Sequence, residues 1–414
     1  MSVPALRFPE FEGEWEENRL NSVVETVTSG SRDWAQYYSD TGAKFIRMTN
    51  IPRDGIRLLL SDLKYVALPA SGSEGARTSL QGGDILVSIT AELGKIGLVP
   101  GDLGEAYINQ HTALVRPNKE KVVPDLLAQL LATKSSKKRL NRLNESGAKA
   151  GLNLGTVRSF RVCLPKHDEQ KKIAGFLGVL DAKIAALRDR IAGLERYKRG
   201  LMQALFSQRL RFIKPDGTPF PDWEEKRLGE VFDITSSKRV FQDEWRDSGV
   251  PFFRAREVVK LAINGYVNNE LFISEEMFAE YSKKFGAPEE GDILVTGVGT
   301  IGRVYLVRRG ENFYFKDGNI VWLRSTKSIS SEFVAHLFKS RLVQKQIITG
   351  AAITTVATYT IDSAKKTKIP VPHPDEQIKI AEALQAMDAK IAAVNGQLDR
   401  MQEFKKGLLQ QMFV

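Results

Sequence analysis

One segment of the sequence, GVGTIG at residues 297–302, has the glycine spacing G-x-G-x-x-G that holds a dinucleotide pyrophosphate at the start of a helix. That chemistry requires a helix to begin at the last glycine, but the next residues, RVYLVRR, are typical of a strand. A related segment earlier in the chain, ITAELG, has Ile89 and Ala91 in place of the first two glycines. We therefore interpret GVGTIG as a loop between strands and expect no cofactor.

Residue types that support catalysis or metal binding are scarce. The sequence contains neither the P-loop pattern G-x-x-x-x-G-K-[ST] nor the [NDS]-P-P-[YF] tetrapeptide that holds an adenine amino group in amino-methyltransferases. Cys163 is the only cysteine, and the histidines are scattered at positions 111, 167, 336 and 373. We expect no catalytic residue and no metal site. A single cysteine also allows no internal disulfide, which fits a reducing compartment.

Length and composition indicate a multidomain globular protein. A chain of 414 residues is too long for one ordinary hydrophobic core. No apolar run has the length of a membrane span, and the first residues do not resemble a signal peptide, so we expect a cytoplasmic protein. The net charge of +10 allows nucleic acid as a partner, since phosphate contacts need Lys and Arg, but does not require it.

The chain is a tandem duplication. Residues 164–207 align without a gap on residues 371–414, and 19 of the 44 aligned positions are identical, including the string DAKIAA in both copies. Upstream, GDILVS at 83–88 matches GDILVT at 291–296, and WEENRL matches WEEKRL. Because these matches span both halves, we infer two copies of one unit, each a globular part followed by a helix.

The globular parts are predicted to be mixed α/β. Runs such as DILVSI and HTALVRP in the first copy, and DILVTGV and NIVWLRS in the second, are rich in β-branched residues and separated by turn signals. Each copy then has a stretch with apolar residues three and four apart, which predicts one helix over residues 124–143 and one over residues 331–348.

The terminal helix of each copy has a heptad pattern, interrupted at the equivalent positions Lys198 and Lys405. A 3.5-residue apolar period indicates a coiled coil, and the natural partner is the other copy. Connectivity then makes the two helices antiparallel. The alternative to a coiled coil is that each helix packs only on its own globular part. The predicted seam consists of Ile173, Leu177, Leu180, Ile184, Leu187, Ile191, Leu194, Ile380, Leu384, Met387, Ile391, Val394, Leu398 and Met401.

These observations predict an α+β protein with pseudo-two-fold symmetry. Two tandem α/β domains are separated by two long antiparallel coiled-coil helices. The expected boundaries are 1–163 for the first domain, 164–217 for the central helix and linker, 218–370 for the second domain and 371–414 for the last helix. The scaffold repeats while the loops vary, which is typical of a recognition protein rather than an enzyme.

The duplicated helix pattern P-x-x-D-E-Q-x-K-I-A…L…DAKI, together with GDIL in each variable part, resembles the specificity (S) subunit of type I restriction-modification enzymes. The resemblance covers essentially the whole chain. It implies a non-catalytic subunit in which each variable part is a target-recognition domain that reads one half of a bipartite, asymmetric DNA site. It further implies that the helices set the spacing of the two halves and bind two methyltransferase (M) subunits. Restriction (R) subunits would join through the complex.

Candidate DNA-binding residues follow from loop position and side-chain chemistry, because Arg and Lys read guanine, Asn and Gln read adenine, and hydroxyls read either. The aligned pair Lys95 and Arg303 is the preferred phosphate or guanine contact. The alternative function is a protein-binding scaffold that does not read DNA. The full set of candidates is Arg47, Thr90, Lys95, Asn109, Gln110, His111, Arg254, Arg256, Thr296, Thr300, Arg303, Lys316 and Asn319.

Overall fold

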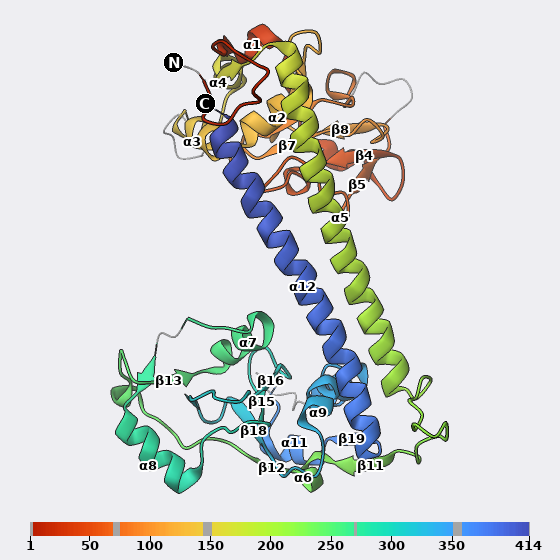
Figure 1. Cartoon of the computed structure of the whole chain (residues 1–414). Coiled ribbons are helices and arrows are strands. Elements are labelled where there is room, and N and C mark those ends of the chain that lie inside the picture. The colour runs from red at the N-terminus through yellow and green to blue at the C-terminus, as the bar shows by residue number, and fades with distance from the viewer. Residues whose placement is uncertain (1–2, 69–74, 144–150, 269–270, 351–357, 414) are drawn as a thin grey trace. The chain divides into compact units, whose positions relative to one another are not determined.

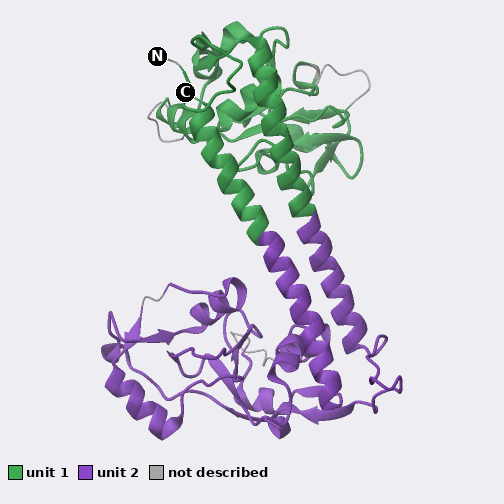
Figure 2. Cartoon of the chain, in the orientation of Figure 1, with its two compact units in different colours: residues 1–189, 396–414 green, residues 190–395 purple. Residues whose placement is uncertain are grey.

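Short β-branched runs form small sheets, in which the pairs β4-β8 and β13-β17 are parallel and the other pairs are antiparallel. The two heptad segments form the longest helices of the chain (Figure 1). The computed structural model describes residues 3–68, 75–143, 151–268, 271–350 and 358–413. The chain divides into two compact units (Figure 2). Unit 1 comprises residues 1–189 and 396–414, and unit 2 comprises residues 190–395. Each unit therefore combines one globular part with the start of one long helix and the end of the other.

Unit 1 contains an antiparallel sheet with strand order β2-β9-β6-β7, a second sheet with order β3-β5-β4-β8, and the separate pair β1-β10. Its strands are β1 (Glu16–Arg19), β2 (Val24–Ser29), β3 (Tyr38–Ser39), β4 (Ala43–Ile46), β5 (Lys64–Val66), β6 (Ile85–Ser88), β7 (Ile96–Leu98), β8 (Ala106–Ile108), β9 (Thr112–Pro117) and β10 (Arg161–Leu164). Its helices are α1 (Leu20–Val23), α2 (Pro124–Ala132), α3 (Lys134–Arg142), α4 (Leu154–Ser159) and the first part of α5 (His167–Phe206).

Unit 2 repeats this plan with the sheet β12-β18-β15-β16, the sheet β14-β13-β17 and the pair β11-β19. Its strands are β11 (Glu224–Arg227), β12 (Phe232–Thr235), β13 (Val250–Phe253), β14 (Phe272–Ile273), β15 (Ile293–Thr296), β16 (Val304–Leu306), β17 (Tyr314–Phe315), β18 (Ile320–Ser325) and β19 (Lys368–Val371). Its helices are α6 (Leu228–Val231), α7 (Ala255–Asn264), α8 (Glu275–Phe285), α9 (Ser331–Phe338), α10 (Arg341–Gly350), α11 (Ile361–Lys366) and the first part of α12 (Pro374–Met412).

The strand of the GDIL motif is buried on both faces, which explains its unbroken apolar run. In β6, Ile85 and Val87 belong to the core beneath α2 and α5, whereas Leu86 belongs to a second core against the β3-β5-β4-β8 sheet. The motif aspartate is also buried. Asp84 accepts two hydrogen bonds from Arg116, and Asp292 accepts one from the indole of Trp322 at 2.8 Å. GDIL is therefore a scaffold motif in both units.

The repeated Asp-Glu-Gln at the start of each long helix is likewise structural. Glu169 is 1% exposed and accepts hydrogen bonds from Arg7 at 2.7 Å and from the indole of Trp15. Glu376, which is fully buried, accepts the equivalent bonds from Arg211 and Trp223. A buried carboxylate needs such partners, because an unpaired charge in the interior is costly.

The motif glutamines tie each long helix to the globular part. The Gln170 side chain donates to the Pro165 carbonyl at 2.9 Å and accepts from the Val123 amide just before α2. Gln377 makes the same two bonds, to Pro372 and from the amide just before α9. The P-x-x-D-E-Q pattern therefore repeats because one local hydrogen-bond network is built twice.

A further repeat, Leu-Arg-Phe at 6–8 and 210–212, lies beside the end of a long helix in each unit. In unit 2 this segment follows α5 along the chain, and the Leu210 amide donates to the Ala204 carbonyl at 3.1 Å. In unit 1 the Leu6 amide donates to the Gln411 carbonyl of α12 at 2.9 Å. The two acceptors are 207 positions apart (411 minus 204), so they are equivalent residues of the repeat.

In unit 1 the first part of α5 lies beside the last part of α12, and the ion pair of Lys405 with Asp181 joins them. In unit 2 the last part of α5 lies beside the first part of α12, joined by the ion pair of Lys198 with Asp388. Every residue of the predicted seam is buried or half-buried. The predicted α/β domains and antiparallel helices are confirmed.

Two features of the secondary structure differ from the prediction. The helix expected over 124–143 is broken at Thr133, whose backbone is extended and whose hydroxyl caps α3 by accepting from the Ser136 amide at 3.1 Å. The helix expected over 331–348 is broken in the same place, between α9 and α10. Apolar spacing of three and four continues through both breaks, so the sequence pattern could not reveal them.

Candidate nucleic-acid interface

The hairpin after each GDIL strand is closed by a buried hydroxyl. In unit 1, Ser88 donates to the Glu92 carbonyl and accepts from the Lys95 amide at 2.8 Å. In unit 2, Thr296 donates to the Thr300 carbonyl and accepts from the Arg303 amide at 3.1 Å. Thr296, one of the predicted DNA-binding residues, is fully buried and holds the hairpin. GVGTIG is the loop of this hairpin, as predicted, with β16 rather than a helix after it.

The aligned pair Lys95 and Arg303 has different surroundings in the two hairpins. Lys95 forms an ion pair with Glu92, which also pairs with Arg53 at 2.6 Å. Hydrogen bonds from these two cations lower the pKa of Glu92 to about 2. Arg303 is exposed, and the residue equivalent to Glu92 is Thr300, which is also exposed. Unit 2 therefore presents a cation where unit 1 presents a neutralised one.

The other three predicted arginines take part in ion pairs within their own units. Arg47 donates to Asp62 at 3.0 Å. Arg254 and Arg256 both contact Glu257, which is 3% exposed. Hydrogen bonds from both arginines lower the pKa of Glu257 against the opposing effect of its burial. The sequence placed Arg256 in a loop, but the structure places it in the first turn of α7, where Glu257 is favoured by the helix dipole.

Several predicted residues of unit 1 meet at one edge of the main sheet, where β2 ends and β9 begins. The Gln110 amide donates to the Ser31 carbonyl at 3.2 Å, and the His111 amide donates to the Asn109 side chain at 3.1 Å. The hydroxyl of Thr90, from the hairpin loop, lies 3.0 Å from Nδ1 of His111. All four predicted residues at this edge are half-buried. The structure thus brings together Thr90, Asn109, Gln110 and His111.

The same edge of unit 2 is formed by different side chains. The Asn319 carbonyl accepts from the Gly297 amide at 2.8 Å, so the backbone arrangement is similar. Lys316 follows β17 and donates its own amide to the Phe253 carbonyl. Both residues are half-buried. Between them, Asp317 accepts from Arg239 at 3.0 Å, whereas the equivalent position of unit 1 holds the uncharged Asn109.

Sequence reasoning missed the contribution of Gly30 and Ser31. A Cβ at Gly30 would lie 2.1 Å from the Ile108 carbonyl oxygen, so only glycine lets the chain after β2 pass so close to the 109–111 loop. The only signal in the sequence is a glycine after the β-branched run VVETVT at residues 23–28, which also fits an ordinary turn.

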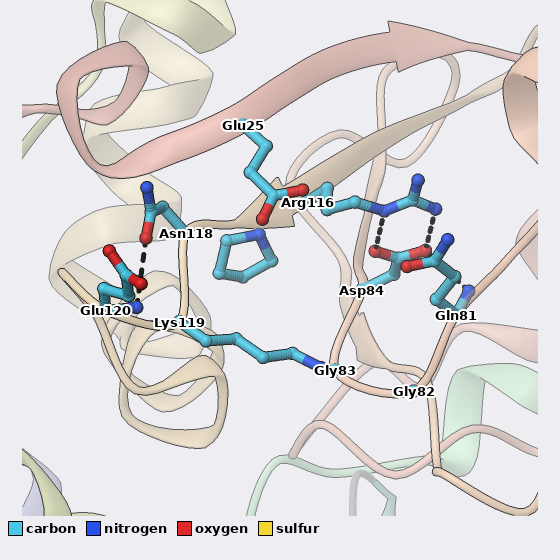
Figure 3. A pocket seen from close by; sticks show the side chains of 10 residues that line it. Glu25, Gln81, Gly82, Gly83, Asp84, Arg116, Asn118, Lys119 and Glu120 are labelled. Carbon is cyan, nitrogen blue, oxygen red and sulfur yellow. Dashed lines mark hydrogen bonds and ion pairs between the residues drawn. The ribbon is translucent and has the colours of Figure 1, made fainter.

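A polar cleft of about 420 Å³ lies on unit 1 beside β9 and the GDIL turn (Figure 3). Figure 3 shows the Arg116 guanidinium facing the Asp84 carboxylate, and the two form a bidentate pair. The positive charge of Arg116 is therefore already neutralised by Asp84. The cleft is lined by Glu25, Gln81, Gly82, Gly83, Asp84, Arg116, Pro117, Asn118, Lys119 and Glu120.

The described residues contain no group of His, Cys, Asp or Glu that could hold a metal ion. Across the same part of the chain, no helix has the length and apolar character needed to cross a bilayer. What the two edges offer is a set of amide, imidazole, hydroxyl and cationic groups on loops held by a rigid sheet. Such groups can bind base edges and phosphates.

The family described as "Type I restriction modification DNA specificity domain" matches the chain twice, over residues 12–196 and 221–403. A putative type I restriction enzyme specificity subunit from Methanocaldococcus jannaschii is 24% identical over 416 residues, covering 96% of this chain and 92% of that one. A putative specificity subunit from Haemophilus influenzae is 33% identical over 159 residues, which is 38% of each chain.

Solved structures show the same fold. The S subunit of a type I restriction-modification system from M. genitalium matches with a TM-score of 0.62 and 17% identity, covering 100% of this chain and 99% of that one. A chain from a structure describing complex assembly and conformational transition of the type I R-M system matches with a TM-score of 0.55 and 18% identity, covering 96% and 97%.

Proposed function

Because the chain belongs to the type I restriction-modification DNA specificity family, whose domain it contains twice, we propose that each globular part reads one half of a bipartite, asymmetric DNA site. The chain is a type I restriction enzyme specificity subunit, and it is non-catalytic. In this proposal the domain boundaries are those of the sequence prediction, with residues 1–163 and 218–370 as the two target-recognition domains and the protein acting in the cytoplasm.

The observation that carries the proposal is the contrast between the repeated scaffold and the unlike edges. Asp84 and Asp292, or Glu169 and Glu376, are buried at equivalent places in the two units. The loop side chains differ: Arg303 is an exposed cation with no ion pair among the described residues, whereas Lys95 is paired with Glu92. The 109–111 loop has an amide and an imidazole where unit 2 has an ion pair. Two domains with the same fold but different loop side chains are suited to bind two different DNA sequences.

The long helices are proposed to bind the methyltransferase subunits and to set the spacing of the half-sites. Phe404 is 54% exposed, and the equivalent residue Tyr197 is 63% exposed. On unit 1 a groove of about 370 Å³ adjoins Phe404, and it is lined by Lys183, Leu187, Gln397, Arg400, Met401 and Phe404. Exposed aromatic side chains at equivalent helix positions suit one partner surface that binds twice. Restriction subunits would associate through this complex.

The test is an exchange of residues 1–163 for the corresponding part of another specificity subunit, followed by sequencing of the DNA that the complex with methyltransferase subunits modifies. One half of the modified sequence should change, and the other half should stay. A change in both halves or in neither contradicts the modular reading. If the modified DNA sequence does not depend on the sequence of this chain, and DNA binding is absent or independent of salt, the protein is a protein-binding scaffold instead.

A further inference from the structure

We propose that Gln110 recognises the adenine of one A·T pair in the half-site read by unit 1, and that His111 and Thr90 position its side chain. This inference rests on the proposed function. The three side chains come from two loops. Thr90 comes from the β6–β7 hairpin loop, and Gln110 and His111 come from the turn between β8 and β9.

The three side chains form a continuous hydrogen-bonded row. Nε2 of Gln110 lies 3.2 Å from Nε2 of His111, and Nδ1 of His111 lies 3.0 Å from the Thr90 hydroxyl. The backbone beneath the row is fixed as well. The His111 carbonyl accepts from the Ile89 amide at 3.1 Å, which joins the two loops directly.

The hydrogen-bond chemistry of the row determines what Gln110 can still offer. An amide nitrogen can only donate, so Nε2 of His111 accepts and the neutral ring carries its proton on Nδ1, which donates to Thr90. Gln110 uses one N–H in this way. Within the described part of the chain, its second N–H and its carbonyl oxygen have no other partner. One free donor beside one free acceptor is the pair that binds adenine at N7 and N6.

The position of the row also favours base reading over a scaffold role. Gln110 and His111 are half-buried, so they are held but reachable. The equivalent residues of unit 2, at the same distance from the aligned GDIL strand, are Gly318 and Asn319, and Val298 replaces Thr90. In unit 2 the equivalent strands β15 and β18 pair without such a row, so this type of sheet edge does not require it.

The test uses the full chain in complex with methyltransferase subunits and a DNA library randomised over the recognition sequence, with modified molecules identified by sequencing. In the variant Gln110→Ala, discrimination for adenine over other bases should fall roughly 5- to 150-fold at one position. That position should lie in the half of the DNA recognition sequence that changes when residues 1–163 are exchanged. In Gln110→Glu, preference at the same position should move toward cytosine, whose N4 amino group a carboxylate can accept from.

Two further variants separate positioning from reading. His111→Asn, which introduces the residue of unit 2, should weaken the same preference at the same position without altering the other half-site. Gln36→Ala, a change at an exposed glutamine of the same unit, should leave the sequence preference unchanged. If Gln110→Ala keeps its full adenine preference while the wild type modifies a bipartite site, the assignment of Gln110 is wrong and the proposed function stands. If the wild type modifies no bipartite site, both are wrong.

Discussion

Nζ of Lys405 lies 2.5 Å from Oδ1 of Asp181, and this contact pairs the residue that interrupts one heptad pattern with the first residue of DAKIAA on the opposite helix. Lys198 and Asp388 make the same pair in unit 2. The interruption is therefore a polar contact and not a defect of the coiled coil. A buried polar residue at a core position restricts the register and direction of two helices, at some cost in stability.

The Lys405 and Asp181 pair should show strong energetic coupling. Lys405 is 6% exposed, while Asp181 also accepts from the Gln129 side chain and is partly open to solvent. We expect Lys405→Ala and Asp181→Ala each to lower the free energy of unfolding by about 2 kcal/mol. The double variant should cost at least about 1 kcal/mol less than the sum. Urea unfolding of the four proteins measures this, and strict additivity would show that the two charges do not interact.

Unit 2 should lose stability at mildly acidic pH because of His336. Burial, together with the nearby cations Lys339 and Lys198, lowers the pKa of His336 to about 4, against the opposing effect of Asp388. The unfolded chain, with a pKa near 6.5, takes up the proton first, so stability falls as pH drops from 6.5 toward 4. Between pH 7.5 and pH 5 the loss from this one group should be about 2 kcal/mol.

The chain provides the control for this prediction. The residue equivalent to His336 in unit 1 is Gln129, which lies at the matching position of α2. The variant His336→Gln should therefore fold and should lose the extra pH dependence. Urea unfolding at pH 7.5 and pH 5 compares it with the wild type. If the free energy of unfolding falls by the same amount between pH 7.5 and pH 5 in both proteins, other groups cause the acid sensitivity.

The two hairpin cations should contribute unequally to DNA binding. Arg303 is exposed, whereas Lys95 is paired with Glu92. Arg303→Ala should weaken DNA binding by the complex and reduce the slope of log affinity against log salt by about 1. Lys95→Ala should change both quantities much less, because the charge it removes is already offset. Titrations at several salt concentrations measure this, and equal effects of the two variants would contradict it.

A single methyl group at Gly30 should disturb the edge of the main sheet in unit 1, where β2 ends and β9 begins. Because a Cβ there would meet the Ile108 carbonyl at 2.1 Å, backbone must move, and we expect Gly30→Ala to lower the free energy of unfolding by about 1–3 kcal/mol. Gly101→Ala is the matched control, since a Cβ at Gly101 meets nothing within 4 Å. It should change stability by less than about 0.5 kcal/mol. Thermal unfolding of both variants decides the comparison.

The repeated parts of the fold could be predicted because periodicity and identity between copies are visible in the sequence. The seam from Ile173 to Met401 follows from its spacing, and the strand after GVGTIG follows from its residue types. The role of Glu169 and Glu376 could not be predicted, because their partners Arg7 and Arg211 lie more than 160 positions away in sequence.

The site was harder to predict than the scaffold. Loop position suggested Arg47 and Arg256, but Asp62 meets Arg47 only once the chain has folded, and Arg256 lies in a helix, where it pairs with its neighbour Glu257. Thr296 looked like a loop hydroxyl, although the hairpin turns it inward. These residues stay predictions as DNA contacts. The contact of Thr90 with His111 needs two loops to meet, and nothing local in either loop announces it.

The hydrogen bond from Leu6 to Gln411 has a consequence for how such a protein could arise. One of the two helix-to-head junctions, at Leu210, is made by peptide bonds, and the other is made through space by equivalent groups. A shorter ancestor containing one repeat would have carried every contact needed to form both junctions between two identical chains. With both repeats joined in one chain, each head can change its sequence without changing the other, which two copies of a single-repeat chain could not do.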